Sequence, residues 1–291
     1  QTYRKYELIV VDDGSTDGTK EVIEKKYKGK LQYYWQRNKG ESRARNYGIS
    51  LAKGKFLAFL DSDDKWHPEK LHYQVDELER RLKENKKIAL LCSSVWLIDA
   101  NGKLINSQPS GRTMNIEKYE IEDFLFRPRI FAPPSNAIFV TEYVKNVGCF
   151  REDIQYGEDW LLLIKLREKF NFAYLDKPLT YYRIHNVNQQ RFPTIDVIDK
   201  KLADYLLLIA NFPKQIDKEL VNKAKALSYM KAGFWCFLYE EWDKGRLYLI
   251  SSENLDKNLL NNQNEIVHWV AKSAIESSLI NSEKSVSSIC N

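Results

Sequence analysis

The first half of the chain alternates short apolar runs with segments that repeat apolar residues at helical spacing. The apolar runs predict strands over residues 6–12, 31–36, 55–61 and 88–99, of which the first reads as fully buried. Between them, helical spacing predicts helices over residues 16–26, 41–53 and 68–83. Asn101-Gly102 predicts a turn into a short partner strand near residues 103–105. This repetition indicates an α/β fold with a mainly parallel, doubly wound sheet.

The pattern changes near residue 190, after which apolar residues recur at helical spacing with few strand signals. We therefore predict an α/β domain over residues 1–190 and an all-helical C-terminal region over residues 191–291. Within that region, residues 226–255 predict an antiparallel helix pair. Its aromatic residues are expected to pack in the core rather than to face a membrane or a partner. They are Tyr229, Phe234, Trp235 and Tyr239.

Composition narrows the classes of partner. The 291 residues include 45 basic and 40 acidic side chains, a net charge of +5, which is too balanced to indicate nucleic acid. Such a charge suits a phosphate-bearing ligand or anionic lipid. The cysteines, Cys92, Cys149, Cys236 and Cys290, lie far apart and predict thiols in a reducing compartment rather than zinc or disulfides. No apolar run approaches the ~20 residues of a membrane span. We expect a cytoplasmic location, with at most peripheral contact at the inner membrane face.

Three acidic clusters stand where predicted strands end or a predicted helix begins. They are Asp12-Asp13, Asp61-Ser62-Asp63-Asp64 and Glu158-Asp159. In an open α/β sheet the carboxyl ends of the strands border the ligand crevice. Carboxylates that converge there repel each other unless a cation lies among them. The clusters therefore predict Mg²⁺ or Mn²⁺, an anionic ligand held by that metal, and one carboxylate left for proton chemistry.

Each cluster also has a structural interpretation. Asp12-Asp13-Gly14-Ser15 is typical of a strand-to-helix turn, although one carboxylate could instead bind a ribose hydroxyl or a base N–H. The cluster from Asp61 to Asp64 could be a solvated loop, but Asp-x-Asp spacing lets two carboxylates meet one hard cation. Acidic residues such as Glu158 and Asp159 are favoured in the first turn of any helix.

A second group of candidates is basic. Gly40 precedes a predicted helix that carries Arg43 and Arg45, so its first N–H groups and one of these arginines form a plausible phosphate cradle. The other arginine is expected to face solvent. His185 follows a strand and lies near Arg183, which makes it a candidate ligand, although a lone histidine is more often structural.

The segments VVDDGSTDGT, NKGESRARNYGISLAKGKFLAFLDSDD and GEDW, in this order, resemble the signature of family 2 glycosyltransferases with the GT-A fold. The resemblance covers residues 1–190. It implies a Rossmann-like domain that transfers a sugar from a nucleotide-diphosphate sugar, a UDP-sugar foremost, to a hydroxyl with inversion. The acceptor would be a saccharide, a lipid-linked molecule or a protein, in the synthesis of cell-surface polysaccharide or glycoconjugate.

The resemblance also implies roles for single residues. Asp12 or Asp13 would contact the nucleoside, and Arg45 would lie near the nucleotide. Asp61 and Asp63 would form the Asp-x-Asp motif with Asp63 as metal ligand. Asp159 would be the catalytic base beside Glu158. Arg183 and His185 match an Arg-x-His segment near the diphosphate, which adds His185 to the candidate metal ligands.

The family normally begins with a strand and a helix ahead of a segment like Gln1-Thr2-Tyr3, so we expect this chain to be a fragment of a longer protein. Two other functions are compatible with part of the pattern. A signalling receiver domain also carries paired aspartates after its first strand and a later one, as Asp12-Asp13 and Asp61 do. It would however need a lysine that residues 103–118 do not convincingly supply, and it would leave Glu158-Asp159 without a role. The second is a relative that binds nucleotide sugars without catalysis.

Overall fold

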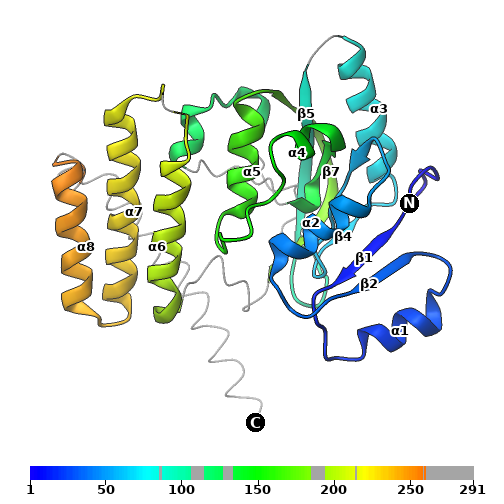
Figure 1. Cartoon of the computed structure of the whole chain (residues 1–291), viewed down its shortest axis with the longest axis horizontal. Coiled ribbons are helices and arrows are strands. Elements are labelled where there is room, and N and C mark those ends of the chain that lie inside the picture. Colours follow the sequence, from blue (N-terminus) through cyan, green and yellow to red (C-terminus); the bar gives the residue numbers. More distant parts are fainter. Residues whose placement is uncertain are drawn as a thin grey trace. The chain divides into compact units, whose positions relative to one another are not determined.

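The computed structural model describes residues 1–84, 87–105, 115–126, 134–184, 194–213, 215–257 and 259. The chain divides into two compact units, Gln1–Ile184 and His185–Asn291 (Figure 1). In the first unit, strands and helices alternate. The strands are β1 (Ile9–Asp12), β2 (Gln32–Trp35), β3 (Phe56–Leu57), β4 (Lys65–Trp66), β5 (Ile88–Ile98), β6 (Ala137–Val140) and β7 (Asn171–Arg183). The helices are α1 (Thr19–Lys26), α2 (Glu41–Leu51), α3 (Lys70–Lys83), α4 (Thr141–Asn146) and α5 (Glu158–Arg167), with short 3₁₀ turns at Ile116–Lys118, Glu122–Phe126 and Pro134–Asn136.

Two sheets organise this unit. β1 and β2 form a parallel pair, and the larger sheet has the order β3-β6-β5-β7-β4. β5 and β7 are its long central strands and run parallel. The remaining pairings, β3 with β6, β6 with β5 and β7 with β4, are antiparallel. The predicted α/β class is confirmed, but the prediction of a mainly parallel sheet is correct only for β1–β2 and β5–β7.

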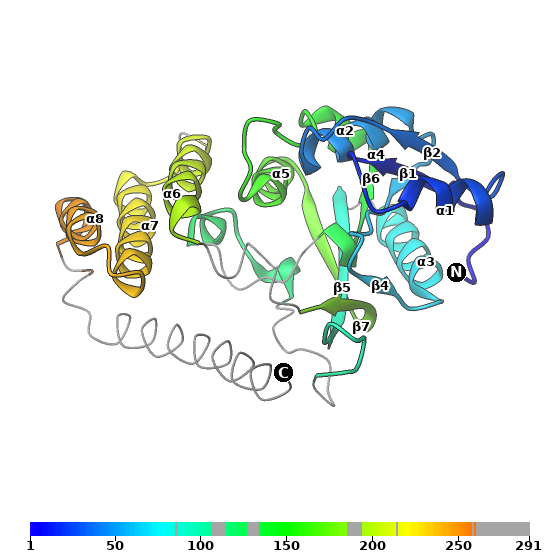
Figure 2. The ribbon, with the colours of Figure 1, turned by 90° about the horizontal axis from the view of Figure 1, so that it is seen from below.

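The core lies on both faces of β5, which is buried along almost its whole length. Helices α3 and α5 lie on opposite sides of β5 and β7 (Figures 1 and 2). Val75 and Leu78 of α3 pack with Leu91 and Ile138 in one apolar cluster. A strand that is covered on both faces has an almost continuous apolar sequence, and the apolar run over residues 88–99 therefore predicts β5.

Several predicted elements are shorter in the structure. β1 begins at Ile9 rather than residue 6, and it is half-buried rather than fully buried. The strand predicted over residues 55–61 contains only Phe56–Leu57, because the chain then leaves the sheet toward the acidic loop. Helix α1 begins after Gly18, whose φ of 83° ends the preceding turn, and not at residue 16. The predicted turn at Asn101-Gly102 is confirmed, since Gly102 N–H donates to the Asp99 carbonyl at 3.0 Å and Ile98 pairs with Leu104.

The second unit contains α6 (Ile195–Ala210), α7 (Lys218–Leu238) and α8 (Trp242–Leu255). Helices α7 and α8 are the predicted antiparallel pair (Figure 1). Tyr229, Phe234 and Trp235 pack against its apolar clusters as predicted, whereas Tyr239 is exposed. No helix within the described ranges is long and apolar enough to span a membrane.

A close contact between α7 and α8 depends on glycine. A Cβ built on Gly245 would lie 2.2 Å from the ring of Phe237, and one on Gly233 would lie 3.0 Å from the Gly245 carbonyl oxygen. We expect Gly245→Ala to destabilise the protein by about 1–3 kcal/mol, because the added methyl overpacks this contact. Thermal unfolding checks this, with Glu253→Ala on the exposed side of α8 as the control. Equal melting temperatures for the two variants would show that Phe237 moves aside at no cost.

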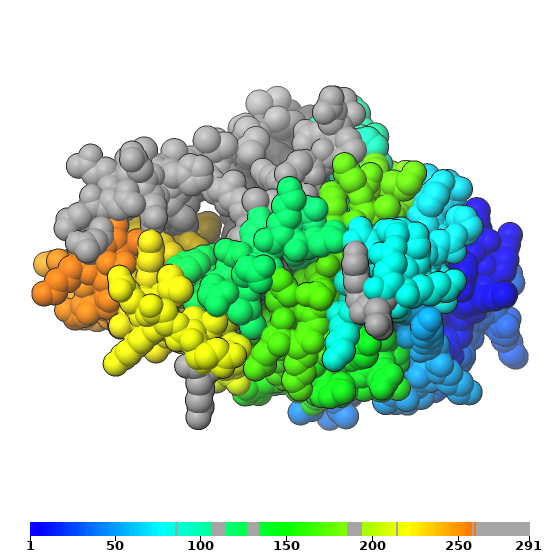
Figure 3. Space-filling model, turned by 90° about the horizontal axis from the view of Figure 1, so that it is seen from above, coloured from blue at the N-terminus to red at the C-terminus, as the bar shows by residue number. Residues whose placement is uncertain are grey.

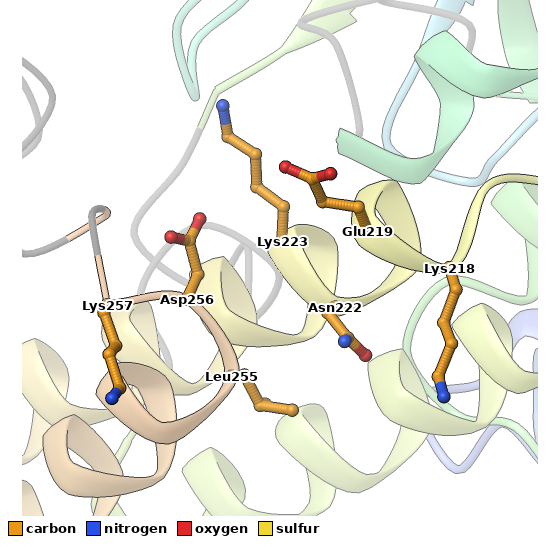
Figure 4. Close-up of a pocket in the computed structure, with 7 residues that line it drawn as sticks. All are labelled: Lys218, Glu219, Asn222, Lys223, Leu255, Asp256 and Lys257. Atoms are coloured by element: carbon orange, nitrogen blue, oxygen red, sulfur yellow. The ribbon is translucent and has the colours of Figure 1, made fainter.

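A pocket of about 350 Å³ lies between the start of α7 and the residues after α8. Its charged lining residues are Lys218, Glu219, Lys223, Asp256 and Lys257. Lys223 points away from Lys218 and Lys257, and the two carboxylates lie among the three lysines (Figure 4). The pocket therefore has no converging set of cations, and none of the predicted site residues lines it.

Candidate active site

Asp12 ends β1 and joins it to β2. Its carboxylate accepts hydrogen bonds from the Tyr33 hydroxyl and, at 2.7 Å, from the Ser15 N–H. Burial alone would raise the pKa of Asp12, but these hydrogen bonds together lower it below the usual value. Burial and the hydrogen bond to Asp12 raise the pKa of Tyr33 to about 12. Asp12 is therefore an ionised group that fixes the turn after β1.

Asp13 organises the loop before α2. Its carboxylate accepts from the Gln36 side chain at 2.6 Å and from the N–H groups of Lys39 and Gly40 at 2.9 and 2.8 Å. The Gly40 N–H thus points at Asp13, whereas the phosphate cradle was predicted from the N–H groups that follow Gly40. Arg43, the other basic candidate at this loop, pairs at 2.9 Å with Glu152 at the surface, and half of its side chain is exposed.

Arg45 of α2 is the centre of the site. Its Nη1 lies 2.8 Å from Glu158 of α5, and its Nη2 lies 3.0 Å from Asp61 and 3.1 Å from Glu41. Only 12% of the side chain is exposed, and the guanidinium lies 5.5 Å from the centre of the Phe150 ring. One buried cation therefore connects the acidic loop after β3 with the first turn of α5, which are far apart in the sequence.

The adjacent residues Glu158 and Asp159 have different environments. Glu158 is 3% exposed, and burial together with the charge of Asp159 raises its pKa to about 7, although Arg45 opposes the shift. Asp159 is partly exposed, and its Oδ1 accepts the N–H of Trp160 at 2.7 Å. Trp160 is itself buried against Phe124. Glu158 is therefore enclosed beside Arg45, while Asp159 reaches solvent from a helix start that its neighbours hold in place.

Residues outside the motif fix the backbone of the acidic loop. The Asp61 N–H donates to the Ser135 hydroxyl at 3.0 Å, and the Asp64 N–H donates to the Asp61 carbonyl at 3.1 Å. Asp64 accepts the Arg183 N–H at 3.0 Å through Oδ1, whereas its buried Oδ2 has no partner among the described residues. Burial raises the pKa of Asp64 to about 6. The loop is thus anchored at both ends, and Asp61 and Asp63 remain partly exposed.

Arg183 has a different set of contacts from the one its motif implies. Its Nε donates to the Asp63 carbonyl at 2.8 Å, and its Nη1 donates to the carbonyls of Asp99 and Ala100 at 2.9 and 2.7 Å. These contacts tie the acidic loop to the turn after β5. His185, the other half of the predicted Arg-x-His segment, lies outside the described residues.

Asp61 and Asp63 could hold a metal ion only together with the phosphates of a bound substrate. In the part of the chain that the structure describes, no group of three or more His, Cys, Asp or Glu side chains is arranged to hold a metal ion. Mg²⁺ is commonly held by one or two carboxylates, with substrate phosphates and water completing its coordination. Asp61 and Asp63, two carboxylates on one anchored loop, fit that mode.

Sequence reasoning missed two of the residues that build this site. Ser135 stands in no motif, and only the fold brings it beneath Asp61. Glu41 did have a signal, because it stands four residues before Arg45 on one helix and such pairs face each other.

Comparison of the sequence with models of known protein families identifies the family of the chain. The model described as "Glycosyl transferase family 2" matches residues 1–148. The chain belongs to glycosyl transferase family 2. This membership excludes the receiver-domain alternative.

Proteins named as glycosyltransferases have similar sequences. The chain is 33% identical over 195 residues to the uncharacterized glycosyltransferase RC0461 of Rickettsia conorii, covering 63% of this chain and 29% of that protein. It is 30% identical over 192 residues to the amylovoran biosynthesis glycosyltransferase AmsB of Erwinia amylovora, covering 63% of this chain and 62% of AmsB. The chain thus spans less than a third of the length of the Rickettsia conorii relative.

Solved structures show the same fold. S. aureus TarS 1–349, in a crystal structure in complex with UDP, superposes with a TM-score of 0.52 at 22% identity, covering 79% of this chain and 64% of TarS 1–349. This likeness confirms the GT-A-type α/β fold for the family 2 chain.

Proposed function

We propose that this family 2 chain transfers a sugar from a nucleotide-diphosphate sugar, a UDP-sugar foremost, to an acceptor hydroxyl with inversion. The observation that carries the proposal is the bridge through Arg45, which joins Asp61 of the Asp-x-Asp loop to Glu158 beside Asp159. This bridge supports the proposal because it links Asp61, a proposed donor-site carboxylate, to Glu158, the neighbour of the proposed base Asp159. The TarS complex with UDP supports the choice of nucleotide.

In the proposed reaction Asp159 accepts the proton of the acceptor hydroxyl. The acceptor oxygen forms a bond to the anomeric carbon from the face opposite the leaving group. The bond from that carbon to the diphosphate oxygen breaks, and its electron pair leaves with the nucleoside diphosphate. A divalent ion, Mn²⁺ or Mg²⁺, held by Asp63 and Asp61 would neutralise the leaving diphosphate. Because Glu158 is buried against Arg45, we assign it the positioning of Asp159, and Asp159 the proton transfer.

The remaining partners follow from the same proposal. Similarity to AmsB, a protein named for amylovoran biosynthesis, supports a role in the synthesis of polysaccharide or glycoconjugate. The acceptor would be a saccharide, a lipid-linked molecule or a protein. A lipid-linked acceptor would bring the protein to the inner membrane face, and the net charge of +5 favours contact with anionic lipid there.

The metal role of Asp63 can be tested by calorimetry. Asp63→Ala should abolish Mn²⁺-dependent binding of UDP without unfolding the protein, because the residue lies in a partly exposed loop. Asp76→Ala, which removes an exposed carboxylate of the same charge from α3, is the control and should bind UDP normally. Unchanged and still Mn²⁺-dependent UDP binding by Asp63→Ala would mean that the metal role is wrong.

A further inference from the structure

Lys70 is a fully buried lysine on the inner side of α3, whose outer side lies at the surface (Figure 3, cyan). Its Nζ donates to the Gln74 side chain at 2.6 Å, approaches the Ala137 carbonyl at 3.5 Å and lies 4.2 Å from the centre of the Trp66 ring. The titratable group that acts on it is the Cys92 thiol of β5, and burial raises the pKa of that thiol to about 12. Burial lowers the pKa of Lys70 to about 7. The partners of its amino group are neutral: an amide, a carbonyl and an aromatic face.

The partners of Lys70 hold the turn Pro134–Asn136. Gln74 Nε2 donates to the Asn136 carbonyl at 2.8 Å, and Trp66 Nε1 donates to the Ser135 carbonyl at 2.7 Å. Thr180 of β7 donates to the same Ser135 carbonyl at 3.2 Å. The turn is therefore fixed from α3, β4 and β7 at once, and its contacts from α3 and β4 are made by residues that touch the lysine.

The turn Pro134–Asn136 also contacts the acidic loop Asp61–Asp64. The Ser135 hydroxyl accepts the N–H of Asp61 at 3.0 Å. A path of contacts thus leads from the Lys70 amino group through Trp66 to Ser135, and from Ser135 to Asp61. A second branch leads through Gln74 to Asn136, the neighbour of Ser135.

We propose that Lys70 is a positioning residue for the loop Asp61–Asp64, which it holds through Trp66, Gln74 and the turn Pro134–Asn136. Packing alone does not explain a lysine here, because burying its charge is costly and an apolar side chain of similar volume would fill the space. A polar network does explain it, since hydrogen bonds that join α3 and β4 to the turn Pro134–Asn136 rigidify these segments. The step from loop position to donor affinity rests on the proposed function, but the loop position itself does not.

The first test uses amide hydrogen exchange, which needs no ligand. Lys70→Met keeps the volume and removes the amino group that donates to Gln74. Exchange in residues 58–66 should therefore become about 3- to 10-fold faster, the effect of losing one hydrogen bond of ordinary strength. Exchange in β5 should change little. The matched control is Leu78→Ala, which removes apolar contacts of the same helix without touching the network. The inference is overturned if the exchange rate of residues 58–66 increases no more in Lys70→Met than in Leu78→Ala.

The second test separates the inference from the proposed function. With Mn²⁺ present, Lys70→Met should bind UDP about tenfold more weakly, and Leu78→Ala should bind it normally. If the wild-type protein binds no UDP, the proposed function fails, while the exchange result still decides the role of Lys70.

Trp66→Phe keeps an aromatic face beside the Lys70 amino group but loses the hydrogen bond to the Ser135 carbonyl, so exchange in residues 58–66 should become faster in this variant as well. This variant decides the question should Lys70→Met not fold, and unchanged exchange in it contradicts the proposal.

Discussion

Asp159→Asn should lower the rate of sugar transfer by about 10²–10⁴-fold, the usual contribution of general-base assistance. The amide keeps the size of the carboxylate and its oxygen, so the hydrogen bond from Trp160 and the start of α5 should survive. UDP binding should therefore remain close to the wild-type value. Calorimetry measures the binding, and the release of nucleoside diphosphate from a nucleotide sugar in the presence of acceptor measures the transfer.

The neighbouring residue supplies the control for this prediction. Glu158→Gln should be the milder change in transfer rate, because Glu158 faces Arg45 and not solvent. If Asp159→Asn turns over near-normally while Glu158→Gln is inactive, the base is the other member of the pair. If both variants transfer sugar at the normal rate, the proposed mechanism at this site is wrong.

Arg45→Met should destabilise the protein by about 3–5 kcal/mol at neutral pH, because it leaves buried Glu158 without the cation that faces it. In wild type the pKa of Glu158 is already raised to about 7, and loss of Arg45 removes the charge that opposes this rise. A carboxyl group with a raised pKa contributes stability that is complete below its unfolded pKa and is lost as the pH rises through the folded pKa. The deficit of the variant relative to wild type should therefore shrink between pH 7 and pH 5.

Chemical denaturation at both pH values measures this effect. Arg43→Met on the same helix is the matched control, because its pair with Glu152 is exposed and such pairs contribute only about 0–1 kcal/mol. A deficit for Arg45→Met no larger than that of Arg43→Met, or one that grows as the pH falls, would contradict the role given to Arg45.

The sequence predicted best those elements whose pattern does not depend on distant contacts. The run Ile88–Ile98 is apolar on both faces and reads as a strand in any context, and Asn101-Gly102 defines its own turn. The strand over residues 55–61 was overpredicted because its apolar residues continue beyond the pairing with β6, which ends at Leu57. The sequence did not predict that β6 pairs antiparallel with β3 and β5. The direction of a strand within a sheet depends on contacts between distant segments, which no local pattern encodes.

For the site, the sequence predicted the carboxylates but not their partners. Asp61 was singled out from its Asp-x-Asp spacing, and Asp159 from the other acidic clusters and the family resemblance. That Arg45 links Asp61 to Glu158 depends on α2 and α5 meeting in space, which no local pattern encodes. No local pattern indicated either that the side chain of Asp13 accepts the N–H of Gly40, the residue before the predicted phosphate-binding helix start.

The most direct test of the proposed activity is the release of nucleoside diphosphate from a panel of nucleotide sugars, measured with Mn²⁺ and with candidate acceptors. We predict that wild-type protein consumes at least one donor, a UDP-sugar foremost, and that Asp63→Ala and Asp159→Asn do not. Folded wild-type protein that neither binds nor consumes any nucleotide sugar in the panel would contradict the account.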